Sequence, residues 1–201
     1  KFYENDFEII RNKLKKYYSF IIPKKFTDDE LIKKIKNAEV AVGNNITKKV
    51  IDNCDKLKFY QHTGTGVDHI DLSIFKNKNI LFANTHSYSK YVAEYAISLM
   101  FTLIKRIHNQ DSLMRKKIWF HPKNFAGTQN YSSDTIFGKK IGILGYGHIG
   151  KSIVDLLQGF KLKFYVLKKQ PLINKKNIIF SSLDEILNSC DIIFICLALA
   201  E

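Results

Sequence analysis

The period of apolar and polar positions changes repeatedly along residues 1–90, which indicates short helices that alternate with short strands. Helices are predicted over Asp6–Lys16, from Thr47, and after two residues that can act as caps, Thr27 and Asp71. Strands are predicted at four apolar runs: Tyr18–Ile22, Glu39–Val42, Leu57–Gln61 and Ile80–Ala83. Such an alternation is typical of a parallel sheet that is covered by helices.

A long helix over Tyr91–Ile107 has almost no polar face, so we expect it to be mostly buried, as a helix at a domain boundary would be. Residues 108–138 lose periodicity and predict an irregular connector with some helix around 109–117. A second alternating region then begins at Lys139. It predicts strands at Lys140–Leu144, Leu162–Leu167, Asn177–Phe180 and Asp191–Leu197, and helices over Ile149–Leu157 and from Ser182 to Leu187.

The composition is that of a folded globular protein, because 45% of the 201 residues are hydrophobic and 25% are charged. No apolar run is long enough to span a bilayer, and residues 1–6 lack the apolar segment of a secretory signal. Three cysteines, Cys54, Cys190 and Cys196, have no metal-ligand spacing. We therefore expect a cytoplasmic protein with buried thiols, no metal site and no membrane partner.

The net charge of +13 is compatible with several anionic partners, but the lysines are dispersed and no wholly basic run exceeds two residues. No signature of a nucleic-acid-binding motif is present. A solvated, lysine-rich surface explains the charge, and no nucleic-acid partner is expected. A nucleotide phosphate is the anionic partner that the rest of the sequence supports.

The glycines Gly145, Gly147 and Gly150 form a G-x-G-x-x-G motif between a predicted strand and a predicted helix. The first glycine permits a tight turn, the second lets the backbone approach a pyrophosphate, and the third lets the helix pack closely on the strand. The pyrophosphate would meet free backbone amides and the positive end of the helix dipole. We therefore predict a dinucleotide site over residues 145–150, with Tyr146, His148 and Ile149 completing the loop.

The residue expected to contact the adenosine ribose is Lys168, which follows the second strand of this unit and is followed by Lys169. An acidic side chain is usual there, because it accepts hydrogen bonds from the ribose hydroxyls. Two lysines would attract a 2′-phosphate instead, which favours NADP over NAD. The alternative is a pair of surface lysines that tolerates NAD.

Several segments in the same order resemble the D-isomer-specific 2-hydroxyacid dehydrogenases, which include phosphoglycerate dehydrogenases and glyoxylate and hydroxypyruvate reductases. The segments are Leu57–Tyr60 with Gly64–Asp71, Ile80–Thr85 with Val92–Glu94, Phe137–Lys151, and Ser182–Glu185 with Asp191–Ile193. The resemblance covers about residues 38–199. It implies an α/β protein in which a flavodoxin-like substrate domain, here residues 1–90, precedes a Rossmann NAD(P)-binding domain, here residues 91–201, both with parallel sheets.

The resemblance also implies roles for individual residues. Thr65 and Gly66 would offer backbone amides to a substrate carboxylate, and Val92 would pack near the nicotinamide. The active site would lie in the cleft between the domains, and the connector 108–138 would support a homodimer. The histidines at 62, 69 and 86 are expected to be local hydrogen-bonding residues, whereas His148 is expected to contact phosphate.

The sequence departs from the family pattern at the catalytic residues, because the family's Arg, Glu and His follow the strand that ends here at Cys196–Glu201. No residue of this chain takes these roles, so we expect a fragment of a longer dehydrogenase that also lacks the first strand of the substrate domain. His86-Ser87 and Ala198 replace the usual Pro-Gly and Pro, which leaves the substrate open. The function expected is hydride transfer between NAD(P) and a small 2-hydroxy or 2-keto acid. The alternative is a non-catalytic, dinucleotide-sensing or corepressor-like protein on the same fold.

Overall fold

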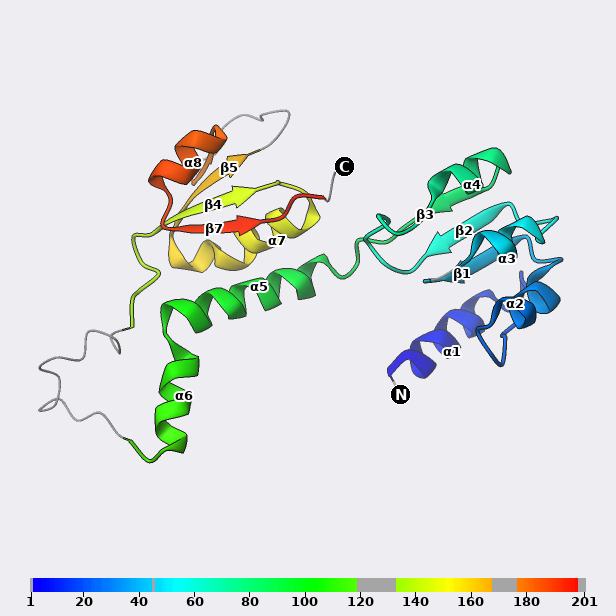
Figure 1. Ribbon diagram of the computed structural model, residues 1–201, viewed down its shortest axis with the longest axis horizontal. Coiled ribbons are helices and arrows are strands. Elements are labelled where there is room, and N and C mark those ends of the chain that lie inside the picture. The colour runs from blue at the N-terminus through cyan, green and yellow to red at the C-terminus, as the bar shows by residue number, and fades with distance from the viewer. Residues whose placement is uncertain (1, 45, 119–132, 168–176, 199–201) are drawn as a thin grey trace, which may run out of the picture. The chain divides into compact units, whose positions relative to one another are not determined.

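The computed structural model describes residues 2–44, 46–118, 133–167 and 177–198, and it divides the chain into two compact units. The first unit is Lys1–Thr85 and the second is His86–Glu201 (Figure 1). The division falls just before a long helix, a few residues ahead of the boundary expected from the sequence. Each unit contains one sheet with only parallel strand pairs, which confirms the predicted α/β class.

Unit 1 is built on a sheet of β1 (Val40–Gly43), β2 (Phe59–His62) and β3 (Leu81–Ala83), in the order β1-β2-β3. Its helices are α1 (Phe2–Leu14), α2 (Asp28–Ile35), α3 (Lys48–Asp52) and α4 (Leu72–Asn77). One core joins the central strand to α3 and α4, where the Tyr60 ring stacks on Phe75 with centroids 5.4 Å apart. Burial of each such side chain stabilises the fold by about 1.5–3 kcal/mol.

One of the two predicted helix caps of unit 1 is confirmed, at Asp71, and the helix predicted to begin at Thr47 is also capped. The Val50 amide donates to the Thr47 hydroxyl, and the Ser73 amide donates to the Asp71 carboxylate. Thr27 is in the N-cap position of α2, but its side chain makes no capping hydrogen bond, so the prediction of a Thr27 cap is wrong. Three acidic residues in the first turn of α2 supply a favourable interaction with the helix dipole without a cap: Asp28, Asp29 and Glu30.

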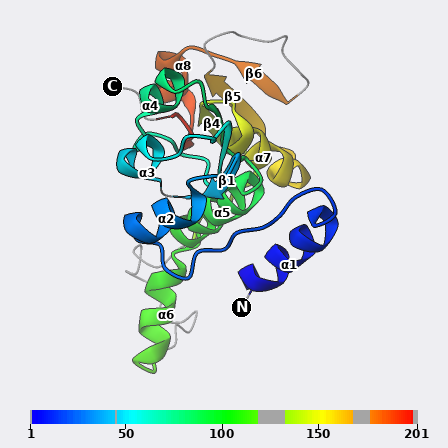
Figure 2. The ribbon, with the colours of Figure 1, turned by 90° about the vertical axis from the view of Figure 1, so that its right-hand side faces the viewer.

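The prediction of a strand at Tyr18–Ile22 is also wrong, because this segment has no strand pairing in the part of the chain that the structure describes. A strand needs a neighbour that accepts its hydrogen bonds, and an apolar run alone does not provide one. The preceding helix α1 stands off the sheet in Figures 1 and 2. Its side chains Ile10 and Leu14, on the predicted apolar face, are exposed.

Unit 2 is built on a four-stranded sheet in the order β6-β5-β4-β7. The strands are β4 (Lys140–Leu144), β5 (Lys163–Leu167), β6 (Ile178–Phe180) and β7 (Ile192–Ile195). The helices are α5 (Ser89–Ile104), α6 (Ile107–Arg115), α7 (His148–Leu157), the short 3₁₀ helix η3 (Gln158–Phe160) and α8 (Leu183–Ser189). All four strands lie close to their predicted positions.

Helices pack on both faces of this sheet. Successive side chains of the central strand β4 point to opposite faces, so neighbouring residues of β4 meet different helices. Gly142 faces Ile186 of α8, where a Cβ would lie only 2.6 Å from the Ile186 side chain. The neighbouring Ile143 faces α7, at Gly150. The central strand is therefore buried on both faces, and this burial places its carboxyl end at the turn into α7.

The long helix α5 differs from its prediction, because only one side of it is buried. Ala93 and Met100 belong to the core that α5 shares with α7 and the sheet. On the other side, Tyr95 and Leu103 are 67% and 69% exposed. The absence of a polar face therefore does not show that α5 is buried, because the described part of unit 2 supplies a packing partner on one side only. Arg106, with φ 50°, then turns the chain into α6.

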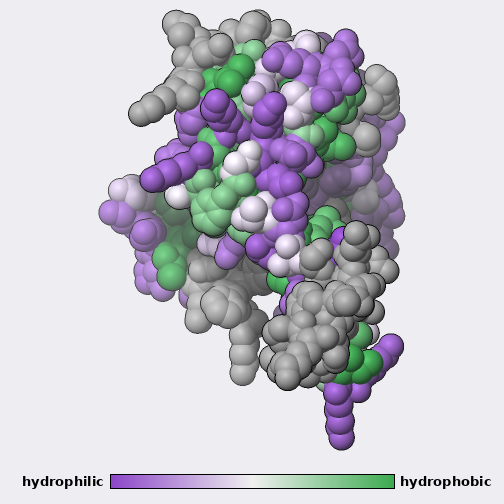
Figure 3. All heavy atoms as spheres, turned by 90° about the vertical axis from the view of Figure 1, so that its left-hand side faces the viewer, coloured by the Kyte–Doolittle hydropathy of each residue, from purple (hydrophilic) through white to green (hydrophobic). Residues whose placement is uncertain are grey.

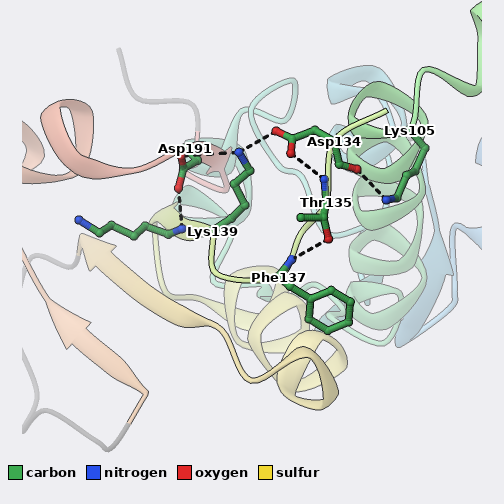
Figure 4. Close-up of polar contacts among 7 residues, drawn as sticks. Lys105, Asp134, Thr135, Phe137, Lys139 and Asp191 are labelled. Atoms are coloured by element: carbon green, nitrogen blue, oxygen red, sulfur yellow. Dashed lines mark hydrogen bonds and ion pairs between the residues drawn. The ribbon is translucent and has the colours of Figure 1, made fainter. Parts of the chain in front are cut away.

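A polar network joins the point where the chain leaves the core of unit 2 to the point where it returns (Figure 4). The Asp134 amide donates to the Ile104 carbonyl, and the Lys105 ammonium donates to the Asp134 carbonyl at 2.6 Å. Lys139 lies 2.7 Å from the Asp134 carboxylate and 3.9 Å from the Asp191 carboxylate. Asp191 also accepts a hydrogen bond from the Lys140 amide. The network therefore fixes the starts of β4 and β7 to the end of α5.

We expect Asp134→Asn to lower the melting temperature of unit 2 at pH 7, and to lower it progressively less as the pH falls below 3.8. The hydrogen bond from Lys139 holds the pKa of the Asp134 carboxyl below its ordinary value of 3.8. Its stabilising contribution is therefore complete above pH 3.8 and is lost as the pH falls through the lowered pKa. Circular dichroism melts across this range measure the effect. In a Lys139→Met background the substitution should have a smaller effect, and an undiminished effect would contradict the pairing.

The surface of unit 2 that faces the viewer in Figure 3 mixes hydrophilic and hydrophobic side chains, without one continuous field of either. This agrees with the dispersed lysines of the sequence. Among the described residues, none of the helices combines the length and the apolar character that crossing a bilayer requires.

Candidate dinucleotide site and carboxylate loop

The turn between β4 and α7 carries the glycine motif, and its first glycine cannot be replaced without strain. Gly145 has φ +98°, in a region that L-residues rarely adopt. A Cβ on Gly145 would also lie 2.7 Å from the carbonyl oxygen of Cys196, in the chain that leaves β7. The first glycine is therefore required both by the tight turn and by the close approach of the neighbouring strand's end.

Gly150 and Gly147 meet opposite surroundings, although both belong to the same motif. A Cβ on Gly150 would overlap the backbone oxygen of Gly145 and lie 3.1 Å from the Ile143 side chain, so the helix packs directly on the turn. Apart from its chain neighbours, a Cβ on Gly147 would meet no atom of the described residues within 4 Å. Packing therefore does not require a glycine at 147, and the space beside its Cβ position is open.

The first turn of α7 offers backbone amides toward that open space. α7 begins at His148, and its N-cap residue Gly147 has no side chain to occupy the free amides. The first amides of a helix have no partner within the helix, and the helix dipole adds a partial positive charge at the same end. An open glycine surface in front of uncapped amides is a suitable cradle for the pyrophosphate of a dinucleotide.

The second residue of the loop, Tyr146, packs with its ring edge against Phe180 of β6, with centroids 6.0 Å apart, and the Lys151 ammonium lies 6.0 Å from its ring centre. Burial raises the pKa of the Tyr146 phenol, so this side chain stays neutral. Burial also raises the pKa of the Cys196 thiol beside the loop. This shift disfavours the thiolate, which is the nucleophilic form of the side chain.

His148, the first residue of α7, stacks on His86. The two ring centroids are 4.3 Å apart and the ring planes are inclined by only 14°. Both residues belong to unit 2 and both are exposed. The expectation from the sequence was a local hydrogen-bonding role for His86, and no sequence pattern placed it at the glycine loop. The sequence feature that sets His86 apart is that a histidine replaces the proline that is usual in the family pattern at this position.

In unit 1, the loop that contains Thr65 and Gly66 follows β2 and is held by residues that follow β3. The Asn84 side-chain amide donates to the Thr65 carbonyl at 2.7 Å, and the Thr65 hydroxyl donates to the Thr85 carbonyl at 2.8 Å. The Thr85 amide donates to the Gly64 carbonyl. None of these bonds uses the amides of Thr65 and Gly66. Asn84 and Thr85 therefore hold the loop in place through these hydrogen bonds. The sequence pattern alone did not show this role.

His62, at the end of β2, is buried and packs as an aromatic ring. It stacks on Phe82 and meets His69 edge-on, with centroids 6.2 Å and 5.8 Å away. Its Nδ1 atom has no hydrogen-bond partner among the described residues. The structure therefore shows no hydrogen bond at Nδ1 of the kind expected for His62.

The remaining predicted residues are placed as follows. Val92 lies on the exposed side of the first turns of α5, next to the fully buried Ala93. Ile149 is partly buried in the first turn of α7. Lys168 and Lys169 lie outside the described residues. Unit 2 therefore brings residues 145–150 together with His86, whereas Thr65 and Gly66 belong to unit 1. The described residues contain no cluster of three or more side chains that could hold a metal ion.

Comparison with known proteins places this geometry in a family. Residues 97–201 match the model of the NAD-binding domain of the D-isomer specific 2-hydroxyacid dehydrogenases. The chain is 31% identical over 154 residues to D-3-phosphoglycerate dehydrogenase of Methanocaldococcus jannaschii, and the match covers 75% of this chain and 28% of the relative. It is 26% identical over 184 residues to glyoxylate reductase of Pyrococcus horikoshii, covering 85% and 53%.

A solved structure with similar architecture is that of an acyclic imino acid reductase in complex with NADPH and D-Arg. The TM-score is 0.78 at 26% identity, and the match covers 94% of this chain and 61% of the other. The chain thus spans between about a quarter and just over half of the length of these relatives.

Proposed function

The chain belongs to the D-isomer specific 2-hydroxyacid dehydrogenase family, and from this premise we propose that it binds NAD(P) at the turn between β4 and α7. The observation that carries the proposal is the contrast within the glycine motif. Gly145 and Gly150 are required by packing, whereas the Cβ position of Gly147 is open space in front of uncapped helix amides. A structural glycine turn requires no such opening, but a pyrophosphate does.

The residues of the chain would position the cofactor. The amides of His148, Ile149 and Gly150 at the start of α7 would donate to the pyrophosphate, and Tyr146 would form an apolar wall of the loop. Val92 would limit the space next to the nicotinamide. When bound, the nicotinamide ring supplies or accepts the hydride, so the protein contributes orientation and electrostatic stabilisation.

The substrate proposed is a small D-2-hydroxy acid or 2-keto acid, bound through its carboxylate. Thr65 and Gly66 would donate their backbone amides, which the internal hydrogen bonds of the loop leave unused in the part of the chain that the structure describes. Asn84 and Thr85 would hold the loop in the conformation that presents them. Bare backbone at glycine lets an anion approach closely. We assign no residue of this chain to the proton transfer.

We also propose that the protein is a homodimer. Its support in the structure is the apolar side of α5, where Tyr95, Leu99 and Leu103 are exposed on one helix. An exposed apolar stripe of this kind is typical of a surface that is covered in an assembly.

The test of the proposed function is direct binding of the cofactor. Titration calorimetry of the purified chain with NADH and with NADPH should show one saturable site for at least one of them. Adenosine, which has the same base and ribose but no pyrophosphate, is the matched control and should bind far more weakly. Failure of both dinucleotides to bind the folded chain would contradict the proposal.

The choice between the two cofactors is a separate prediction that rests on sequence position. We propose that Lys168 contacts the 2′-phosphate of NADP, so the chain should bind NADPH about tenfold more tightly than NADH at low ionic strength. The preference should shrink as salt is added, because salt screens exposed charges. Lys168→Asp should reverse it, since a carboxylate repels the phosphate and accepts from the ribose hydroxyl. Equal binding of NADH and NADPH at low salt would show that Lys168 is only a surface residue.

A further inference from the structure

The pair formed by His86 and His148 connects the start of unit 2 to the cofactor loop. His86 is the first residue of this unit, and 62 positions of sequence separate it from His148. The rings are nearly parallel and their centroids are 4.3 Å apart, so the two distant chain segments meet at this contact. Since both residues are exposed, the stack is not a by-product of burial in the core.

Each ring of the pair belongs to a fixed backbone. The His86 carbonyl accepts hydrogen bonds from the Ser89 amide at 3.1 Å and from the Ser89 hydroxyl at 2.7 Å, and Ser89 is buried in the first turn of α5. The His148 carbonyl accepts from the Ser152 hydroxyl, one turn further along α7. α5 and α7 in turn share the core of unit 2. The stack therefore joins two anchored helix starts.

The His148 side chain is exposed, and the stack on His86 is its ring contact in the part of the chain that the structure describes. It projects from the first residue of α7, beside Gly147, whose open surface faces the uncapped amides. An exposed side chain in that position would sample several rotamers, and ordering it upon binding costs affinity. A neighbouring ring that already holds it in one orientation removes part of that cost.

We propose that His86 is a positioning residue of the dinucleotide site: it stacks on His148 and holds that imidazole next to the pyrophosphate. The inference rests on the proposed function, because it assigns a role at the same site. It does not require His86 to touch the cofactor. A flat ring at position 86 is sufficient for the role, whereas the nitrogen atoms of His86 are not needed.

The experiment measures NADH and NADPH binding by calorimetry for the wild-type chain and for His86→Ala, His86→Phe, His148→Ala and the double alanine variant. His86→Ala should weaken binding of the tighter dinucleotide about fivefold. His86→Phe, which keeps a ring for stacking, should restore affinity to within about twofold of wild type. In the His148→Ala background, His86→Ala should have almost no further effect.

His108→Ala is the matched control, because it removes another exposed imidazole of unit 2 that lies on α6. It should leave dinucleotide affinity unchanged. The stack itself has an independent signature: the ring-current shift of the His148 imidazole protons should disappear in His86→Ala and persist in His86→Phe. Urea unfolding checks that each variant is folded.

The possible results separate the two proposals. If wild type binds a dinucleotide but His86→Ala binds it equally well, the role of His86 is overturned and the proposed function stands. An equal loss with and without His148 would likewise overturn positioning through His148. A loss that His86→Phe does not restore would show that the imidazole nitrogens act and not the stacked ring. If wild type binds neither dinucleotide, both proposals fail.

Discussion

Replacement of Gly147 by valine is expected to abolish dinucleotide binding and to leave unit 2 folded. Apart from its chain neighbours, no atom of the described residues lies within 4 Å of the Cβ position of Gly147. Its φ of −84° is accessible to valine, so the fold accommodates the side chain. The valine methyl groups would then fill the space proposed for the pyrophosphate. We expect the affinity for NADH and NADPH to fall by at least about 100-fold, which corresponds to about 2.7 kcal/mol. Titration calorimetry together with urea unfolding measures the two effects.

Gly159→Val is the matched control for this substitution. Gly159 lies in η3, beyond the other end of α7, and a Cβ there also meets no atom within 4 Å. Both variants should unfold at similar urea concentrations, but only Gly147→Val should lose the cofactor. Unchanged dinucleotide affinity in folded Gly147→Val would show that the cofactor does not bind at this loop.

Gly150→Ala is expected to have the opposite signature, a large loss of stability. Its Cβ would overlap the backbone oxygen of Gly145 and press on the Ile143 side chain, and backbone atoms cannot move aside at low cost. α7 would have to shift away from β4, which would open the core that both share. We expect the free energy of unfolding of unit 2 to fall by about 2–4 kcal/mol.

Urea denaturation followed by circular dichroism measures this loss. Gly159→Ala provides the reference, because a methyl group there meets nothing and also lowers the entropy of the unfolded chain. It should be neutral or slightly stabilising. If Gly150→Ala unfolds at the same urea concentration as wild type, α7 does not pack on the turn as closely as the structure shows.

The strands and the glycine motif of unit 2 could be predicted because they depend on local information. β4 is buried on both faces, so its residues form an almost continuous apolar run that ends in the turn glycines. The caps at Thr47, Asp71 and Ser182 are equally local, since each side chain bonds an amide two or three residues away. Local sequence patterns therefore indicated where most elements begin and where the glycine turn lies.

The features that could not be predicted depend on partners that are distant in the sequence. Tyr18–Ile22 has the apolar pattern of a strand but no neighbour to pair with among the described residues. Because α5 has apolar residues on most of its sides, its sequence does not indicate which side packs against α7. The stack of His86 on His148 requires α5 and α7 to pack side by side, and no pattern within either segment encodes that placement. Likewise, the Asn84 side chain reaches Thr65 only because β2 and β3 are adjacent.

The network around Asp134 has a consequence for how this architecture can vary in evolution. Because the Ile104 carbonyl and the Asp134 amide are hydrogen-bonded, the chain leaves and re-enters the core of unit 2 at nearly the same point. A segment whose two ends are held together can change in length with little effect on the free energy of folding. In general, each doubling of the length of a flexible loop costs only about 0.6 kcal/mol of closure entropy. Insertions and deletions between these two residues would therefore leave the sheet and the glycine turn undisturbed. The hydrogen bond between Ile104 and Asp134 therefore separates changes in the length of this segment from the β4–α7 turn.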